Sequence, residues 1–368
     1  MKDKMKILIL SNSLPGLFQF RKELILKLIE EGYSVTICAP NGKKKEFFIE
    51  NKCRYIEVKM KRKGKNPFSE LKLLFHYLRL VKKEKPGLVL TYTIKPNLYG
   101  GIVCRLLKVK HIANITGLGS LVNSNFILLY ITKFLYRFSL QKSSCVFFQN
   151  DNDLYQSSKI GINTQNKRLI PGSGVNLDQF QYQEYPPTEE NLNFLFIGRV
   201  MKEKGIDFYL DAAKFIRTKY PNTCFHIVGP CEDDYSDKLE ELHNKGIVIY
   251  HGLKDDVSEI YKLTHCTIHP TYYAEGMSNV LLESAASGRP VIATDRPGCR
   301  EIIDDGINGY LVKQKDGLDL ISKIENFIRL EYEVKKQMGI SGRKKVEREF
   351  DRNLVISAYL EEIKMALG

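Results

Sequence analysis

The sequence predicts an α/β protein built from two Rossmann-like domains that face each other across a cleft. Three observations lead to this fold class. Short strand-like runs alternate with amphipathic helical segments, the alternation occurs in each half of the chain, and a polar segment rich in Gly and Pro separates the halves at 171–192. Strands that alternate with helices form parallel sheets, and ligands bind at the carboxyl ends of such strands.

Each half of the chain contains six strand-like runs. In the first half they are KILIL (6–10), SVTICA (34–39), RYIEV (54–58), LVLTY (88–92), HIANIT (111–116) and CVFFQ (145–149), with helical patterns at 20–32 and 68–85. In the second half they are NFLFIG (193–198), CFHIVG (224–229), VIYHG (248–252), CTIHP (266–270), PVIAT (290–294) and GYLV (309–312).

Length and composition agree with two domains. A chain of 368 residues exceeds one typical domain, and a hydrophobic content of 43% supplies folded cores. We expect one domain over 1–175, a second over 176–350, and a helix over 351–368 that packs back on the first.

The same sequence features bear on localisation. The segment MKDKMKILILSNSLPG has the pattern of a first strand, not of a signal peptide, and no apolar run reaches 18 residues. Eight Cys without a CxxC pair are typical of a reduced, cytoplasmic chain.

The charge is distributed unevenly. Residues 1–180 hold 31 basic and 12 acidic side chains, a net charge of +19, whereas residues 181–368 have a net charge of −6. Residues 52–85 are the most basic, and 126–138 (FILLYITKFLYRF) form an apolar, aromatic run that is too short to span a bilayer. These features indicate contact with an anionic membrane surface. The alternative is a core helix beside a solvated charge run; motifs for nucleic-acid binding are absent.

Two cations follow the first strand of the second half. In FIGRVMKEKGID (196–207), Arg199 and Lys204 lie five residues apart at the carboxyl end of a strand. A guanidinium fork and a compact ammonium suit a diphosphate. Taken alone, the pair also fits a solvated loop.

Two carboxylates flank a helix start in EGMSNVLLESAASGRPVIATD (275–295). We expect a helix over about 279–286, capped by Ser278 or Asn279 and closed by Gly288. Glu275 then precedes the helix and Glu283 lies one turn inside it. Such a helix N-terminus attracts phosphate, and carboxylates accept hydrogen bonds from sugar hydroxyls. The alternative is a capped surface helix with a stray acid.

Three other motifs are weaker. Gly16 lies in the first strand-to-helix turn, which lacks GxGxxG. PGSGVN (171–176) fits an ordinary linker turn as well as it fits a Gly-rich binding loop. Asp151 or Asp153 of the DND run fits a helix cap better than a metal site. His265 and His269 bracket a strand, so their spacing is not that of a zinc site.

These motifs together resemble the retaining GT-B glycosyltransferases of family 4. The resemblance rests on Arg199-x4-Lys204 followed by Glu275-x7-Glu283. It covers nearly the whole chain, because MKILILSNS, TYTIKPNLYGG, ITGLGS, IPGSGVNLDQF, FIGRVMKEKGID, HPTYYAEGMSNVLLESAASGRPVIATD and GINGYLV occur in the family's order. TYTIKPNLYGG and ITGLGS are most similar to the bacterial capsule, O-antigen and lipid-linked oligosaccharide subgroup.

The resemblance implies a function and a set of roles. A hexose or N-acetylhexosamine would pass from a UDP-sugar to an undecaprenyl-diphosphate-linked saccharide, at the inner face of the plasma membrane, without a metal or other cofactor. Arg199 and Lys204 would stabilise the departing UDP, Glu275 would contact the sugar and Glu283 the ribose. The remaining donor contacts would come from Gly16, Gly198, Gly276, Met277, Ser278, Asn279 and Val280.

One position departs from the family's pattern. Many relatives have a His near the transferred sugar where this chain has Thr116. Thr116 is therefore a candidate sugar contact, and the donor sugar is not fixed by the sequence. The same fold also serves UDP-N-acetylglucosamine 2-epimerases, and a non-catalytic nucleotide-sugar-binding protein is a third alternative.

Overall fold

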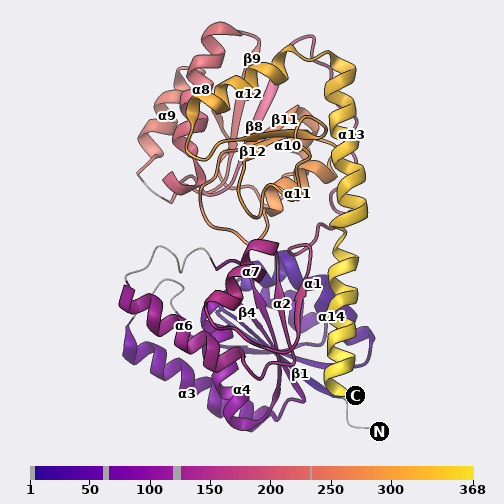
Figure 1. The fold of residues 1–368 in the computed structure, drawn as a ribbon. Coiled ribbons are helices and arrows are strands. Elements are labelled where there is room, and N and C mark those ends of the chain that lie inside the picture. The colour runs from indigo at the N-terminus through magenta and orange to yellow at the C-terminus, as the bar shows by residue number, and fades with distance from the viewer. Residues whose placement is uncertain (1–4, 61–65, 119–125, 233) are drawn as a thin grey trace. The chain divides into compact units, whose positions relative to one another are not determined.

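The computed structural model describes residues 5–60, 66–118, 126–232 and 234–368, and the chain divides into two compact units. Unit 1 comprises residues 1–173 and 353–368, and unit 2 comprises residues 174–352. Each unit has one sheet with helices on both faces (Figure 1). All strand pairings in the described sheets are parallel, which confirms the predicted α/β class.

The sheet of unit 1 has the strand order β3-β2-β1-β4-β5-β6-β7. Its strands are β1 (Lys6–Ser11), β2 (Ser34–Ala39), β3 (Arg54–Glu57), β4 (Leu88–Tyr92), β5 (Lys110–Ile115), β6 (Cys145–Phe148) and β7 (Lys167–Leu169). Its helices are α1 (Leu14–Glu30), α2 (Lys45–Glu50), α3 (Pro67–Glu84), the π-helix η1 (Pro96–Gly100), α4 (Gly101–Leu107), α6 (Phe126–Leu140), α7 (Asp151–Lys159) and α14 (Arg352–Leu367).

The sheet of unit 2 has the order β10-β9-β8-β11-β12-β13. Its strands are β8 (Leu192–Ile197), β9 (Thr223–Val228), β10 (Ile249–Tyr250), β11 (Cys266–His269), β12 (Val291–Thr294) and β13 (Gly309–Val312). Its helices are the 3₁₀ turn η2 (Lys202–Lys204), α8 (Ile206–Lys219), α9 (Ser236–Asn244), α10 (Ser258–Leu263), α11 (Asn279–Ala286), α12 (Gly317–Arg329) and α13 (Tyr332–Glu349).

All twelve strand-like runs of the sequence are strands, and their limits differ from the predicted ones by a residue or two. The sequence analysis missed β7, a three-residue edge strand that reads KRL and lacks an apolar pattern. It also began the first helix too late. α1 starts at Leu14 because Pro15 is tolerated in a first helical turn and the Ser13 side chain caps the N–H of Gly16.

The cores lie on both faces of each sheet. In unit 1, apolar residues of β1, β2 and β4 pack against α1 on one side and against α3 and α4 on the other. Val355, Ala358, Tyr359 and Ile363 of α14 are buried in the first of these clusters. In unit 2, β8, β9 and β11 pack against α8 and α12, and α11 and α13 close the other face.

Candidate active site

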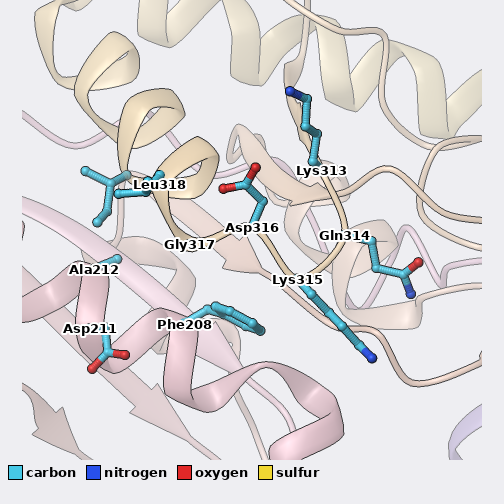
Figure 2. Close-up of a pocket in the computed structure, with 10 residues that line it drawn as sticks. Phe208, Asp211, Ala212, Lys313, Gln314, Lys315, Asp316, Gly317 and Leu318 are labelled. Atoms are coloured by element: carbon cyan, nitrogen blue, oxygen red, sulfur yellow. The ribbon is translucent and has the colours of Figure 1, made fainter.

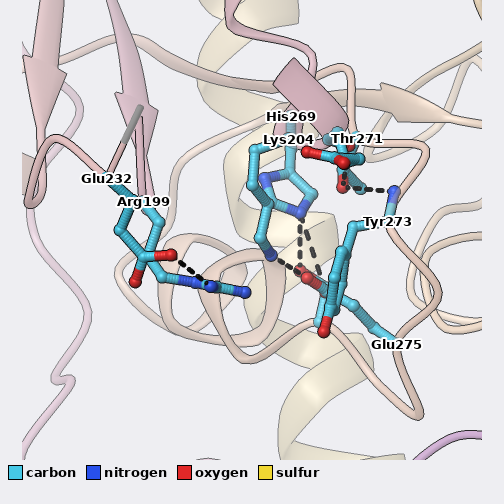
Figure 3. A network of polar contacts seen from close by, with 9 residues as sticks. Arg199, Lys204, Glu232, His269, Thr271, Tyr273 and Glu275 are labelled. Carbon is cyan, nitrogen blue, oxygen red and sulfur yellow. Dashed lines mark hydrogen bonds and ion pairs between the residues drawn. The ribbon is translucent and has the colours of Figure 1, made fainter. Parts of the chain in front are cut away.

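The strand order of unit 2 reverses between β8 and β11. The chain runs outward through β9 and β10 on one side and through β12 and β13 on the other. Ligands of open α/β sheets bind beyond the carboxyl ends of the strands at such a reversal. Arg199 follows β8 at this edge, and the loop of residues 270–278 follows β11 (Figure 3).

A close approach of two backbones fixes the loop that follows β11. Gly205 has φ of 78°, and a Cβ atom there would lie 2.1 Å from the Pro270 carbonyl oxygen, so a larger residue would push the loop away. The Glu203 carbonyl accepts the backbone N–H groups of Tyr272 and Tyr273, both at 2.9 Å. The 3₁₀ turn η2 and the loop are thus held together as one piece.

This anchoring brings Lys204 and Glu275 into contact. The Lys204 ammonium forms an ion pair with the Glu275 carboxylate, and both side chains are largely buried. Burial, and next the nearby charge of Arg199, lower the pKa of Lys204 to about 8. Lys204 is therefore a cation at neutral pH.

Arg199 lies on the other side of the same loop. Its Nη1 atom is 2.7 Å from the Glu232 carboxylate. Its guanidinium carbon lies 5.3 Å from the centre of the Tyr273 ring, and Lys204 Nζ lies 5.5 Å from that centre. Both cations therefore contact one aromatic face, and each has a carboxylate partner, as Figure 3 shows. Glu232 is held beside β8 because its N–H donates to the Val200 carbonyl.

His269 ends β11 beneath this cluster and is fully buried. Its Nε2 atom is 3.2 Å from the Ser278 hydroxyl and 3.9 Å from the Glu275 carboxylate, while its Nδ1 atom has no partner among the described residues. Burial, and next the Lys204 charge, hold the pKa of His269 well below its usual range, so the ring is neutral. Because the His269 ring is neutral, Lys204 is the cation that balances the charge of the Glu275 carboxylate.

The expected helix is present as α11, with the predicted limits. Its capping differs, because Ser278 occupies the N-cap position but makes no side-chain cap; its hydroxyl is directed to His269. The Ser278 N–H donates to the Gly298 carbonyl, so this donor is not open to a ligand. Asn279 starts the helix, and its side-chain oxygen is buried with no partner among the described residues. Glu283 lies one turn inside and is 8% exposed.

The other residues predicted to contact the donor already take part in contacts within the protein. The Gly198 N–H donates to the Val228 carbonyl at 2.9 Å, Met277 is part of the unit 2 core, and the Val280 carbonyl accepts the Tyr261 hydroxyl at 3.4 Å. The Gly276 carbonyl oxygen lies so close to Gly298 that a Cβ atom added to Gly298 would be 2.9 Å from that oxygen.

Two candidates lie in unit 1. The sequence predicted Gly16 in the turn before the first helix, whereas the structure places it in the first turn of α1. Its N–H donates to the Ser13 hydroxyl oxygen at 3.1 Å. Thr116 is exposed and follows β5.

The structure corrects the expectation for the DND run. Asn150 caps α7, and neither Asp151 nor Asp153 does. Asp153 is buried and accepts hydrogen bonds from the Leu118 N–H at 3.2 Å and the Asn150 side chain at 3.1 Å. His265, the other residue considered for a metal, is bonded to Asn193 and Pro187 and does not approach His269's partners. Among the described residues, no group of three His, Cys, Asp or Glu side chains could hold a metal ion.

An open pocket of about 590 Å³ lies elsewhere in unit 2, between α8 and the loop from β13 to α12 (Figure 2). Phe208, Leu318 and Ile321 supply its apolar wall, and Lys313, Lys315 and Asp316 its polar wall. The motif residues do not line it. Near the site, the Tyr272 ring lies 4.8 Å from Lys315 Nζ of this pocket.

Sequence reasoning missed Glu232 and Tyr273 and set His269 aside. His269 could have been found, because a histidine at the end of the strand before Glu275 must lie at the same sheet edge. Glu232 follows a different strand, 33 residues beyond Arg199, and only the strand order makes them neighbours.

Two family models match the chain. One, described as "Glycosyl transferases group 1", matches residues 191–329, and one described as "Glycosyl transferase 4-like" matches residues 6–150. An N,N'-diacetylbacillosaminyl-diphospho-undecaprenol alpha-1,3-N-acetylgalactosaminyltransferase of Campylobacter jejuni is 24% identical over 97% of this chain and 98% of its own. The UDP-Gal:alpha-D-GlcNAc-diphosphoundecaprenol alpha-1,3-galactosyltransferase of Escherichia coli is 24% identical over 73% of this chain and 71% of its own.

Solved structures agree in fold. A glycosyltransferase of Rickettsia africae has a TM-score of 0.82 at 20% identity and covers 99% of both chains. HepE of Anabaena in complex with UDP has a TM-score of 0.80 at 16% identity, over 98% of this chain and 100% of that one. The fold is GT-B, as the sequence predicted.

Proposed function

This chain belongs to the group 1, family 4-like glycosyltransferases, and we propose that it transfers a hexose or N-acetylhexosamine from a UDP-sugar to an undecaprenyl-diphosphate-linked saccharide. The names of the Campylobacter and Escherichia relatives describe such acceptors, and a Staphylococcus aureus relative, 27% identical over 78% of this chain, is a capsular polysaccharide glycosyltransferase. The product would belong to a bacterial surface polysaccharide or glycan.

One observation carries the donor half of the proposal. Arg199 and Lys204 lie against one tyrosine ring at the strand reversal of unit 2, each paired with a carboxylate. A diphosphate can compete with the two carboxylates for both cations, because lysine and arginine make short, charge-assisted contacts to phosphate and those of arginine can be bidentate. Negative charge that develops on departing UDP is then met by two preorganised cations.

The two glutamates have separate roles in this proposal. Glu275 is released from Lys204 when the diphosphate binds, and it faces the transferred sugar. Glu283 accepts from the ribose hydroxyls, and the open N-terminus of α11 adds N–H donors for phosphate. Calorimetry with UDP separates these roles: Glu283→Gln should weaken UDP binding, whereas Glu275→Gln should lower kcat without weakening UDP binding. The reverse pattern would contradict the assignment.

Three finer statements rest on the resemblance and the residues. Transfer retains the anomeric configuration, which the NMR coupling of the product's anomeric proton would test. The reaction needs no divalent metal, because Arg199 and Lys204 supply the charge; EDTA should leave turnover intact. Thr116 is proposed as a contact of the transferred sugar, and Gly16 as a contact of the phosphates.

The N-terminal half is also proposed to meet an anionic membrane surface, at the cytoplasmic face of the plasma membrane. Lipid-linked acceptors lie there, and residues 1–180 have a net charge of +19. Within the described residues, every helix is too short or too polar to cross a bilayer.

The decisive experiment is a panel of UDP-sugars incubated with the purified chain, with and without a lipid-linked acceptor. We expect UDP release that is slow alone and strongly accelerated by the acceptor. A 2-epimerase would convert its UDP-sugar without any acceptor. A nucleotide-sugar-binding protein would bind UDP and release nothing, which would refute a transferase.

A further inference from the structure

The outer face of α3 combines large apolar side chains with cations. Phe68, Leu71 and Phe75, at helical spacing, are 77%, 50% and 50% exposed. The same stripe continues into Arg79, Lys82 and Lys83, which are also exposed. Exposed apolar residues at i, i+3 and i+7 are not needed for the fold, because Leu73, Tyr77, Leu80 and Val81 already face the core.

The acidic residues of α3 do not neutralise this face. The helix contains two, Glu70 and Glu84. Glu70 is paired with Lys95 at 2.6 Å, and Glu84 is buried and paired with Arg54 at 2.8 Å. The exposed stripe of α3 is therefore apolar over its first two turns and positive over its last two.

A second helix presents similar residues on the same side of the unit 1 sheet. Tyr130 and Phe134 of α6 are 70% and 63% exposed, Ile131 is exposed beside them, and Arg137 follows one turn later. Both helices contact η1 and α4, so they flank the same segment, as Figure 1 shows. The connections from β3 to β4, through α3, and from β5 to β6, through α6, run in the same direction along the sheet. Right-handed crossovers therefore place α3 and α6 on the same face of the sheet.

We propose that the exposed stripes of α3 and α6 form the docking surface of this chain for an anionic lipid bilayer. The aromatic and aliphatic side chains enter the headgroup region, and the cations at the ends of the helices bind lipid phosphates. The charge favours this occupant over a second copy of the chain, because two copies would bring like-charged stripes together. The inference rests on the proposed function, since a lipid-linked acceptor requires such a surface.

The test is sedimentation with vesicles of phosphatidylcholine alone or mixed with phosphatidylglycerol. Wild type should pellet with the mixed vesicles, less in high salt. A combined Phe68→Gln, Leu71→Gln and Phe75→Gln variant should bind more than about tenfold more weakly, because three partly inserted apolar side chains are lost. A combined Arg79→Gln, Lys82→Gln and Lys83→Gln variant should lose roughly fivefold per cation and most of its salt dependence.

The matched control replaces exposed apolar residues of unit 2, Phe215→Gln, Leu263→Gln and Leu318→Gln, and should bind vesicles like wild type. Equal vesicle binding by the α3 apolar variant and wild type would overturn the proposal, as would a concentration-dependent dimer without lipid that this variant abolishes. Transfer to a detergent-dispersed acceptor should survive in the α3 apolar variant. Failure of wild-type transfer with every UDP-sugar would instead refute the proposed function and leave the vesicle result standing.

Discussion

The two sheets reverse their strand order in the same way, yet the edges at the two reversals have opposite chemistry. In unit 2, the edge at β8 and β11 holds Arg199 and Lys204, each paired with a carboxylate. In unit 1, Tyr92 of β4 lies against the Tyr359 ring of α14, and the buried Tyr92 hydroxyl and Arg21 Nε have no hydrogen-bond partner among the described residues. The same topology therefore carries different side chains in the two units.

In unit 1, a hydrogen-bonded cluster joins β5, the end of β6 and α14. The Asn114 amide donates to the Tyr359 hydroxyl of α14 at 2.8 Å, and its oxygen accepts from Gln149 at 3.2 Å. The buried guanidinium of Arg21 lies 5.1 Å from the Tyr92 ring centre and 5.9 Å from that of Tyr359. Polar groups of this cluster therefore hold α14 on the sheet, whereas those at the edge of unit 2 are proposed to hold a nucleotide.

The largest expected effect tests the unit 2 edge. Lys204→Ala should lower kcat by about 10²–10³, because one preorganised contact to the departing diphosphate is lost. Glu275 loses its ion-pair partner in this variant, so some stability should be lost as well, and the effect on kcat should be the larger one. Steady-state kinetics with UDP release as the readout measure this. Lys202→Ala, an exposed lysine in the same turn, is the control and should have near-normal turnover; a Lys204→Ala enzyme that matched it would remove Lys204 from the mechanism.

The matching substitution in unit 1 should act on stability instead. Asn114→Ala leaves Tyr359 and Gln149 without their partner, and each unsatisfied buried group costs about 1–3 kcal/mol. We expect a loss of about 2–4 kcal/mol in the free energy of unfolding, with the UDP affinity of the folded protein unchanged. Urea denaturation and calorimetry measure the two quantities, and exposed Asn152→Ala is the control. A large loss of UDP affinity without a loss of stability would show that the two edges do not differ in this way.

The comparison also shows how far the sequence alone could lead. Periodic apolar runs located twelve strands, and the spacing of Gly288 and Ser278 located α11, because these signals are local. β7 was missed since a three-residue edge strand is stabilised by its pairing with β6 and not by its own pattern. The start of α1 was misplaced since a proline in a first turn looks like part of a loop.

The site was predicted in part for the same reason. Arg199, Lys204, Glu275 and Glu283 are found in two short motifs, and the strand order brings the first three of them together. The partners Glu232 and Tyr273 depend on contacts between different loops, which no local pattern encodes. The side-chain cap expected of Ser278 fails because His269, nine residues earlier, competes for its hydroxyl.

A smaller effect should follow from the pKa of Lys204. Burial and the charge of Arg199 lower this pKa to about 8, so Lys204 loses its proton as the pH rises through that value. UDP should bind with constant affinity up to about pH 7.5 and then lose up to roughly tenfold per pH unit, because only the protonated lysine attracts the diphosphate. Calorimetry between about pH 7 and 9.5 checks this. In Lys204→Arg the loss should vanish, since a guanidinium keeps its charge; the same loss there would assign the titration to another group.

The smallest effect concerns the carboxylate on Arg199. A Glu232 carboxylate oxygen lies 2.7 Å from the Arg199 guanidinium, so a diphosphate must displace this carboxylate or bind beside a second negative charge. Glu232→Gln removes this competition, and we expect UDP to bind about two- to fivefold more tightly, since partly exposed ion pairs contribute about 0.2–1 kcal/mol. Glu203→Gln, an equal charge change on the same edge without a contact to Arg199, is the control. A double-mutant cycle with Arg199→Met completes the test, because the gain from Glu232→Gln should disappear when the guanidinium is absent. Weaker UDP binding by Glu232→Gln would mean that the carboxylate orients Arg199 for the nucleotide. The Arg199–Glu232 ion pair would then persist in the UDP complex and would not be displaced by the diphosphate.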